Sequence, residues 1–289
     1  MRKIFLLAIS FLILNSLIAQ DDAEKKPSYW KLTGKFDLNF SQSSYSNWAA
    51  VNAMSGKLTT RFDLNYKKND VDFKNILIMG YGLAFQGSDR HKIDDRIDFS
   101  SSFGYKAFGK VDYTALATFK SQFDLGYRSY PVQPGALYYS KFMAPATTTM
   151  SLGFDYKPSK EFSLFVSPIS GKLTFVLDDS LSNVGAFGVK PGKNTFYEFG
   201  ASLRASYTKK IKDNITLNSR VDLFSNLLRY PENVDIDWSL DITFQLTKYL
   251  KSTIGFQAKY DDDMRNTKPD RGPELQFRQF LDIGFSYSF

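Results

Sequence analysis

The sequence has no cysteine and only one histidine, His91. Disulfide cross-links are therefore excluded, and one histidine without cysteine cannot supply the usual ligands of a zinc site. We expect no metal and no cofactor. The chain also lacks a block of charge of one sign, because its 37 Lys and Arg residues are interleaved with 30 Asp and Glu residues. Nucleic-acid-binding proteins gather basic residues in a patch, so nucleic acid is not expected as a partner.

Long apolar runs and helical periods are missing beyond the first 20 residues. At the start of the chain, Arg2 and Lys3 precede the apolar run 4–14, and small or polar residues follow up to Gln20. This run is shorter than the roughly 20 apolar residues of a membrane-spanning helix. The pattern is typical of a cleaved signal peptide at residues 1–20, which predicts export and leaves residues 21–289 as one domain. Since no cysteine follows the run, a lipid anchor is not expected.

The main positive feature is an alternation of apolar and polar residues that repeats along the chain. Trp238 and Leu240, for example, alternate with Ser239 and Asp241. Successive side chains of a strand point to opposite faces, so such a segment has one apolar and one polar face. Most of these segments reach the roughly 9–11 residues that a tilted membrane strand needs. Twelve strands are predicted, at residues 30–41, 54–67, 71–86, 95–107, 110–124, 142–157, 161–177, 194–208, 214–228, 234–246, 251–261 and 275–289.

The connections between these segments alternate in length. The tight turns are KKND, AFGK, KPSKE, KKIKDN and TKYLK. The longer connections are SSYSNWAAVNA, GSDRHKID, LGYRSYPVQPGALYYSK, DDSLSNVGAFGVKPGK, LRYPEN and DDMRNTKPDRGPE. Short periplasmic turns and long extracellular loops characterise outer-membrane barrels. We therefore predict an all-β fold, a closed antiparallel transmembrane β-barrel of about twelve strands, in the outer membrane of a Gram-negative bacterium. A soluble periplasmic β-sandwich is the alternative.

In such a barrel the aromatic faces meet lipid and the polar faces line the lumen. The candidate lumen network contains Arg61, Asp63, Lys120, Arg204, Arg220, Asp222 and Asp241. The same faces carry Lys57, Asp112, Asp155, Glu198, Asp237, Lys259, Arg278 and Asp282. Mixed signs favour ion pairs across the interior over a selectivity ring of one sign. Twelve strands lie between the filled eight-stranded barrels and the aqueous pores of sixteen or more, so the lumen is expected to be narrow or occluded.

The first long connection is an uncharged stretch that contains Ser46, Asn47 and Trp48. Together with the preceding residues 34–42, GKFDLNFSQ, it resembles the N-terminal signature of a Bacteroidetes-type family of outer-membrane β-barrels, catalogued as domain of unknown function 3078. The resemblance implies the barrel fold and brings no activity with it. The composition of the stretch favours a loop folded inward over the lumen as a plug, and the alternative places Trp48 in an interfacial aromatic girdle.

The end of the chain also resembles that of outer-membrane barrels. Phe285, Tyr287 and Phe289 share one parity and finish the last predicted strand. This resembles the terminal signal that the barrel assembly machinery recognises, which implies that machinery as a partner during biogenesis. Outer-membrane lipid and lipopolysaccharide are the other expected partners. The acidic clusters at residues 94–95, 178–179 and 261–263 lack the spacing of a calcium loop, and a hydrated rim bridged to lipopolysaccharide is the preferred interpretation.

Three functions fit this sequence. A monomeric barrel acting as a narrow or gated porin-like passage for small polar solutes is preferred. A non-transporting barrel subunit of an envelope assembly, secretion or nutrient-uptake complex is the second. An outer-membrane hydrolase is the weakest, because His91, Ser88, Asp94 and Asp95 crowd into one connection without a nucleophile elbow. No enzymatic activity is therefore expected.

Overall fold

The structure is a computed structural model that describes residues 28–43, 53–87, 89–127, 132, 135–261 and 275–289. Residues 1–30 form one unit, and Lys31–Phe289 form a second unit that contains the barrel. In the first unit, the Ser28 hydroxyl accepts a hydrogen bond of 3.3 Å from the Trp30 N–H. The predicted signal peptide, residues 1–20, and the predicted plug residues Ser46, Asn47 and Trp48 lie outside the described residues.

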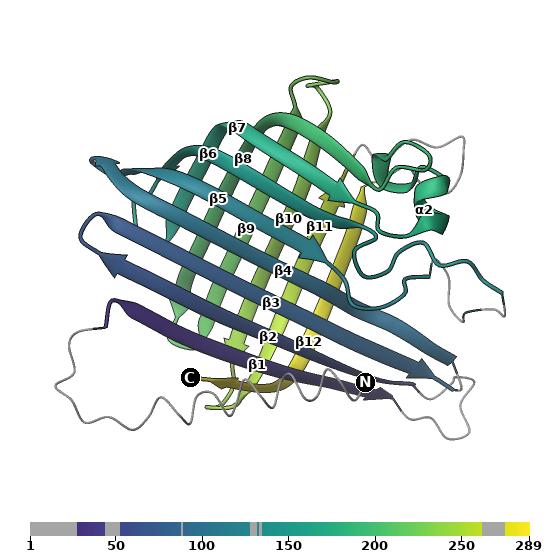
Figure 1. Cartoon of the computed structure of the whole chain (residues 1–289). Helices are drawn as coiled ribbons and strands as arrows, with labels where there is room; N and C mark the ends of the chain where they lie inside the picture. Colours follow the sequence, from purple (N-terminus) through teal and green to yellow (C-terminus); the bar gives the residue numbers. More distant parts are fainter. Residues whose placement is uncertain (1–27, 44–52, 88, 128–131, 133–134, 262–274) are drawn as a thin grey trace, which may run out of the picture. The chain divides into compact units, whose positions relative to one another are not determined.

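The described strands form a closed antiparallel barrel in which each strand pairs with its neighbours in sequence and β1 pairs with β12 (Figure 1). This confirms the predicted fold class. The strands are β1 (Trp30–Ser43), β2 (Ala53–Lys68), β3 (Val71–Gln86), β4 (Asp89–Phe108), β5 (Val111–Ser121), β6 (Ala146–Tyr156), β7 (Phe162–Phe175), β8 (Thr195–Lys212), β9 (Ile215–Asn226), β10 (Val234–Gln245), β11 (Leu250–Tyr260) and β12 (Gln276–Ser288).

Helical structure in the described ranges is confined to the connection between β7 and β8. It consists of the short helix α2 (Asp179–Asn183) and the 3-10 turn η1 (Ala186–Gly188). In Figure 1 this connection lies at the end of the barrel where the longer loops gather. No helix in the part of the chain that the structure describes is long and apolar enough to cross a membrane.

The connection between β3 and β4 differs from the prediction. GSDRHKID was expected to be a long loop, but β4 begins at Asp89 and pairs with β3 up to the partners Gln86 and Asp89. Strict alternation fails here because the register shifts between Gly82 and Leu83, which leaves Ile93 as an extra residue in β4. A bulge of this kind changes which parity faces the lumen while the hydrogen-bonded ladder continues. His91 is therefore a strand residue, opposite Ala84.

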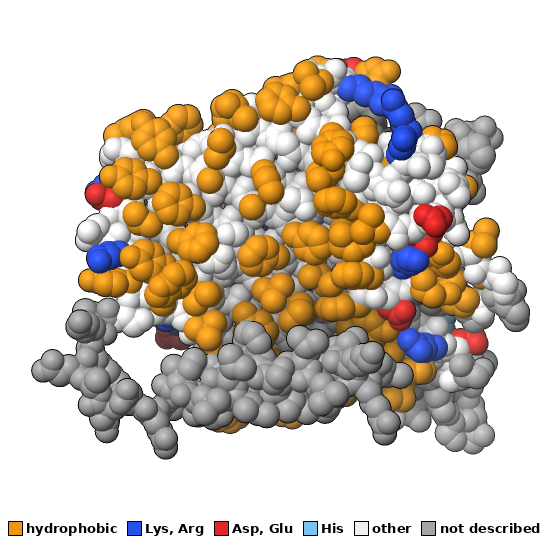
Figure 2. Space-filling model, viewed as in Figure 1, with side chains coloured by type: hydrophobic (Ala, Val, Ile, Leu, Met, Phe, Trp, Pro, Cys, Tyr) orange, Lys and Arg blue, Asp and Glu red, His pale blue; other side chains and the backbone are white. Residues whose placement is uncertain are grey.

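The side chains divide by face as a membrane-spanning barrel requires. Large apolar side chains on the outward parity are exposed, for example Leu281 at 67%, Met150 at 65% and Phe103 at 47%. Figure 2 shows apolar side chains spread over the strands in view, with the visible charged side chains toward the two ends. The buried residues are mostly polar and include Lys57, Lys172, Asp155 and Glu198. Lipid accepts an apolar exterior, and only a closed sheet leaves no unpaired backbone edge in it.

The two ends of the barrel sheet meet at a glycine. The Gly34 N–H donates to the Phe289 carbonyl and the Phe289 N–H donates to the Gly34 carbonyl, both at 3.0 Å. The Phe289 ring lies where a Gly34 side chain would stand, and it stacks on Phe36 with 6.2 Å between ring centroids. In the β1–β12 register, Tyr287 lies opposite Phe36 and Phe285 lies opposite Leu38. The three terminal aromatic residues therefore lie on the outer face of the barrel, along the β1–β12 seam. Their role as an assembly signal stays a prediction.

Replacing Gly34 with Val is expected to lower the free energy of unfolding by about 1–3 kcal/mol, because its side chain would overlap the Phe289 ring and open the seam. The measurement is urea unfolding in detergent, followed by the loss of the fast-migrating folded band on unboiled gels. Gly171→Val is the control, since a Cβ at Gly171 has no heavy atom within 4 Å. Equal stability of the two variants would show that the ring does not fasten the seam.

Candidate functional site

The candidate functional site is the polar lumen, where several contacts join strands that are not neighbours. Lys120 of β5 reaches Asp237 of β10 with an Nζ–Oδ2 distance of 2.6 Å. Arg204 of β8 donates to the Ser100 hydroxyl of β4 at 3.2 Å. Arg278 of β12 approaches Asp94 of β4 at 3.9 Å. Since the paired strands lie apart around the barrel, each of these contacts crosses the interior.

The predicted lumen residues fall into several groups. Arg204 and Arg220 both pair with Asp222, the second at 3.2 Å. Arg61 and Asp63 form a bidentate pair along β2, with both hydrogen bonds at 2.7 Å. Lys120 joins Asp237, which also has Lys259 at 3.7 Å. Asp241 lies among the cations Arg96, Lys57 and Lys251. The interior therefore brings charges of opposite sign together in local groups.

The most buried ion pair among the described residues joins Glu198, which the sequence interpretation placed on the lumen face, to Lys172, which it missed. The Lys172 ammonium lies 2.6 Å from Asp235, 3.1 Å from Glu198 and 3.5 Å from Asp261, and its side chain is 8% exposed. It also lies 5.5 Å from the centre of the Phe224 ring. We call the carboxylates of Glu198, Asp235 and Asp261 the acidic cage.

Local backbone geometry explains why Lys172 was missed. In β7 the residues Ser163, Phe165 and Ser167 point inward, but the register shifts between Ser167 and Ser170. After this shift the even-numbered residues point inward, so Lys172 joins the lumen face. Strict alternation from Phe165 would have placed it toward lipid. The alternation in the sequence does place Asp235 on the lumen face, because Asp235 shares the parity of Asp237 and Asp241.

The same irregularity gathers serine hydroxyls on the inner wall. Ser170 contacts the Ser151 and Ser202 hydroxyls at 2.8 Å each and the Ser167 hydroxyl at 3.0 Å. Ser167 and Ser170 are fully buried. Buried hydroxyl groups are costly unless they are hydrogen-bonded, and here they bond to one another and to the carbonyls of Leu152 and Ile169. This part of the wall is packed.

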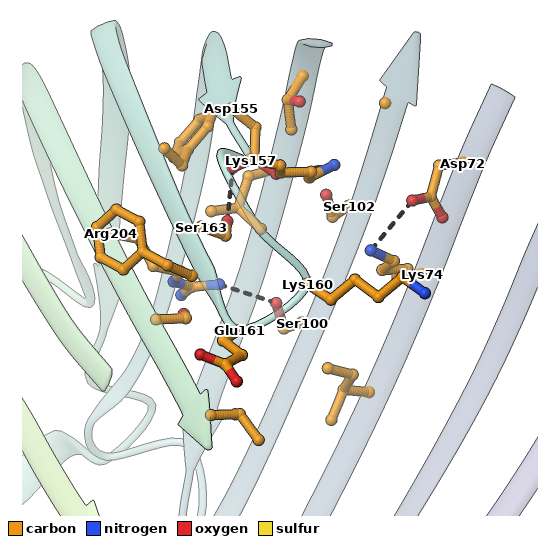
Figure 3. A pocket seen from close by; sticks show the side chains of 18 of the residues that line it. Asp72, Lys74, Ser100, Ser102, Asp155, Lys157, Lys160, Glu161, Ser163 and Arg204 are labelled. Carbon is orange, nitrogen blue, oxygen red and sulfur yellow. Dashed lines mark hydrogen bonds and ion pairs between the residues drawn. The ribbon is translucent and has the colours of Figure 1, made fainter. Parts of the chain in front are cut away.

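Toward the short turns the lumen widens into a hollow of about 670 Å³, which we call the vestibule. It is lined by residues of β2 to β8 and by Ser159, Lys160 and Glu161 of the β6–β7 turn. Figure 3 shows Lys160 and Glu161 on this turn, and Arg204 reaching Ser100 on the facing wall. The vestibule thus extends from the short turns to the level of the Arg204 contact.

Most charges that line the vestibule are paired. Lys157 lies 2.7 Å from Asp112 and 3.0 Å from Asp155, and the Ser163 hydroxyl donates to Asp155 at 2.6 Å. Burial lowers the pKa of Lys157, but the two carboxylates outweigh it and the net pKa is raised. Lys157 therefore stays charged at neutral pH. A hollow with both signs of charge on its wall suits small polar solutes.

At the opposite end, two long connections fold into a small core. We call this the loop cap, residues 138–144 and 176–189. Ala144, Val176, Leu181 and Val189 are buried together, with Phe196 packed against them. Val176 and Phe196 continue the inward rows of β7 and β8, so the loop cap covers the lumen side of these strands.

Asp178 holds the loop cap together. Its carboxylate accepts hydrogen bonds from the Leu181 N–H at 2.9 Å and the Tyr138 hydroxyl at 3.0 Å, and it lies 2.5 Å from the Lys141 ammonium. Burial raises the pKa of Asp178, but these contacts outweigh burial, and the net pKa lies below the ordinary value. The charged form is therefore favoured in the folded cap.

Two of the candidate hydrolase residues, Asp94 and Asp95, contact cations or backbone groups. Ser88 lies outside the described residues. Asp94 faces the lumen beside Arg96 and Arg278, both at 3.9 Å. Asp95 lies 2.6 Å from Lys92 and accepts the Phe123 N–H at 2.7 Å. Both carboxylates are thus engaged by other groups. Among the described side chains, no group of three or more His, Cys, Asp or Glu could hold a metal ion.

Comparison with known proteins finds a family model that matches part of the chain. Residues 40–127 match the family model described as "Protein of unknown function (DUF3078)". The predicted resemblance to this family is confirmed over those residues. No curated protein matches the chain. With its closed sheet, apolar exterior and polar lumen, the chain is an outer-membrane β-barrel.

Similar solved structures include other outer-membrane proteins. The COG4313 outer membrane channel from Pseudomonas putida F1 is 10% identical, with 93% of this chain and 99% of that chain covered and a TM-score of 0.41. The translocator domain of the autotransporter NalP from Neisseria meningitidis is 11% identical, with 98% and 97% covered and a TM-score of 0.37. Outer membrane phospholipase A from Escherichia coli is 9% identical, with 93% and 95% covered and a TM-score of 0.35. At such low identities and TM-scores, the functions of these proteins cannot be assigned to this chain.

The loop cap should be insensitive to mild acid. Because the pKa of Asp178 is lowered, its stabilising charge is fully present above the ordinary pKa of about 3.9 and is lost only as the pH falls through the lower folded value. Hydrogen exchange of residues 177–189, corrected for intrinsic rates, should stay slow from pH 7 to about pH 4. Asp178→Asn should speed exchange at neutral pH, with a loss of about 1 kcal/mol.

The control for this experiment is Asp179→Asn, which removes the exposed neighbouring carboxylate and leaves the Asp178 contacts in place. Its exchange should match that of the unmodified barrel. Loss of protection already at pH 5 would contradict the assignment of Asp178 as the residue that holds the cap.

Proposed function

We propose that this barrel is a narrow, gated passage for small polar solutes and that cross-lumen ion pairs form its gate. The observation that carries this proposal is the contact of Lys120 with Asp237 across the lumen, with side chains 32% and 27% exposed. Water reaches both groups, and a solvated ion pair contributes only about 0–1 kcal/mol. A passing solute can therefore displace this pair at little cost.

The vestibule supports the same function. Its volume of about 670 Å³ is in the range of small-molecule sites, roughly 300–1,000 Å³. It leads from the short turns to Arg204, whose guanidinium contacts Ser100 across the interior. A solute held in the vestibule would meet polar groups that exchange partners. Because the wall carries both signs, solutes with small, mixed or no net charge suit it.

We propose no catalytic role for the barrel. Asp94 lies 3.9 Å from both Arg96 and Arg278, and Asp95 lies 2.6 Å from Lys92, so cations engage both candidate carboxylates. This favours structural roles for the two carboxylates over the hydrolase function.

A non-transporting barrel subunit is the second candidate. The observation that favours it is the loop cap, whose apolar core lies on the lumen side of β7 and β8 and narrows that end. A barrel closed in this way could serve as a scaffold for an envelope complex. Electrical recordings separate the two functions.

In planar bilayers the purified barrel should give small ohmic currents. The double variant Lys120→Ala, Asp237→Ala should raise conductance severalfold, because it removes a cross-lumen contact without changing net charge. The matched control is Asp72→Ala, Lys74→Ala, which removes an ion pair of 3.0 Å that lies along β3 alone. Its conductance should stay close to that of the unmodified barrel.

Two outcomes would contradict this proposal. Silence of both the unmodified barrel and the double variant would favour the subunit function. An equal increase in the two double variants would show that loss of charge in general, and not removal of a gate, widens the path.

A further inference from the structure

We propose that the outer face of the barrel carries a binding site for the headgroup of an anionic phospholipid, formed by Lys209 and Lys212 near the end of β8. This inference goes beyond the proposed passage and does not depend on it. Lys212 is the last residue of β8, beside the short turn to β9. The short turns lie at the end of the barrel away from α2 (Figure 1). Because short turns are periplasmic in outer-membrane barrels, the lipid around this end is the phospholipid of the periplasmic leaflet.

The short-turn end is rich in lysine. The exposed lysines of the five short turns and of the strand residues beside them are Lys67, Lys68, Lys106, Lys110, Lys160, Lys209, Lys210, Lys212 and Lys248. The exposed acidic residues of the same segments are Asp70, Glu161 and Asp213. The exposed charge of these segments is therefore mainly positive, which attracts anionic groups. Lys67 and Lys160 line the vestibule, so the lysines are divided between the lumen and the outer face.

The pairing of β8 with β9 places Lys209 on the outer face. Lys209 lies opposite Leu217, and Leu217 lies opposite Ile242 of β10. Ile242 belongs to the apolar row of β10 that includes Trp238 and faces lipid. Lys209 also follows Tyr207 by two residues, on the same face and closer to the turn. The ammonium group of Lys209 therefore leaves the barrel wall where the apolar surface ends.

A bulge brings Lys212 to the same face. Strict alternation from Lys209 would direct Lys212 inward, but the register shifts between Lys210 and Lys212 and leaves Ile211 as an extra residue. Bulges change the direction of side chains in this way. Lys212 consequently lies opposite Ile215, which shares the parity of the outward residues of β9. The irregularity thus places two lysines side by side along the lipid-facing edge of one strand.

Tyrosines mark the level of the lipid headgroups at this end. The exposed tyrosines near the short-turn ends of the strands, or in a short turn, are Tyr105, Tyr113, Tyr156, Tyr249 and Tyr287. Tyr105 lies opposite Tyr113 in the β4–β5 register, in the outward row of Phe103. Tyrosine rings on the outside of membrane proteins gather at the headgroup level. Lys209 and Lys212 lie beyond Tyr207, on the turn side, so they can reach lipid phosphates.

The charges of the two lysines are available to a ligand. Both side chains are exposed, and none of the ion pairs among the described residues includes Lys209 or Lys212. Asp213 follows directly and offsets part of the positive charge of the turn. The Glu161 side chain of the neighbouring turn lines the vestibule instead. A phosphodiester with one net negative charge suits two ammonium groups, whereas a zwitterionic headgroup carries a competing cation of its own.

The test is lipid binding to the intact barrel, measured by native mass spectrometry in detergent with added phosphatidylglycerol or phosphatidylcholine. The unmodified barrel should bind phosphatidylglycerol more tightly. The double variant Lys209→Gln, Lys212→Gln should weaken binding of the first phosphatidylglycerol by about 5- to 30-fold, since each lysine near anionic lipid contributes a factor of about five. Its binding of phosphatidylcholine should not change. Lys209→Arg, Lys212→Arg should keep the preference, because both positive charges remain.

The matched control is Lys190→Gln, Lys193→Gln. It removes two exposed lysines from the long connection between β7 and β8, and it changes net charge by the same amount. Its affinity for phosphatidylglycerol should match that of the unmodified barrel. An equal loss in both glutamine variants would overturn the site, because it would show a general effect of net charge.

Two further results would overturn the proposal. Unchanged phosphatidylglycerol affinity in Lys209→Gln, Lys212→Gln would show that the headgroup binds elsewhere. Equal affinity of the unmodified barrel for the two lipids would exclude recognition of anionic headgroups, and the exposed lysines would then suit an acidic periplasmic protein instead.

Discussion

Backbone hydrogen bonding between β1 and β12 is the constraint on which the rest of this structure depends. Hydrocarbon offers no partner for a free N–H or carbonyl group, so a sheet in lipid must close on itself. Here the closing contacts include the reciprocal bonds of Gly34 and Phe289. Once the sheet is closed, every strand has one face toward lipid and one toward the lumen. The alternation in the sequence follows from this single requirement.

Closure also determines what the interior must contain. With the apolar side chains facing lipid, the enclosed face is polar, and its charges have to be paired or hydrated. The ion pairs differ in the free energy that is needed to break them. Breaking a buried pair such as Lys172 with Glu198 costs about 3–5 kcal/mol, whereas a solvated pair such as Lys120 with Asp237 contributes about 0–1 kcal/mol. The lumen therefore combines ion pairs that are costly to break with ion pairs that break at little cost.

The sequence predicted the fold well because period-two alternation is the direct consequence of closure. The strands β2, β9 and β10 pair without a register shift in β2–β3 and β9–β10, so simple alternation describes their charged faces. It failed at β4 and β7, where the register shifts and inward parity changes. Whether a strand contains a β-bulge depends on how it pairs with both neighbouring strands, and this pairing is not visible in the sequence of the strand itself. Lys172 was missed for this reason, although its partner Glu198 was placed on the lumen face.

The two ends of the lumen differ in a way that follows from the lengths of their connections. Tight turns leave the short-turn end open, and the vestibule lies there. Long connections at the other end have enough residues to bury an apolar core, and Asp178 fixes that core by capping α2 and pairing with Lys141. In the proposed passage, a solute that leaves the vestibule meets hydrated ion pairs, whereas a solute at the other end meets an ordered loop core. Solute exchange at the vestibule is consequently expected to be faster than passage beneath the loop cap.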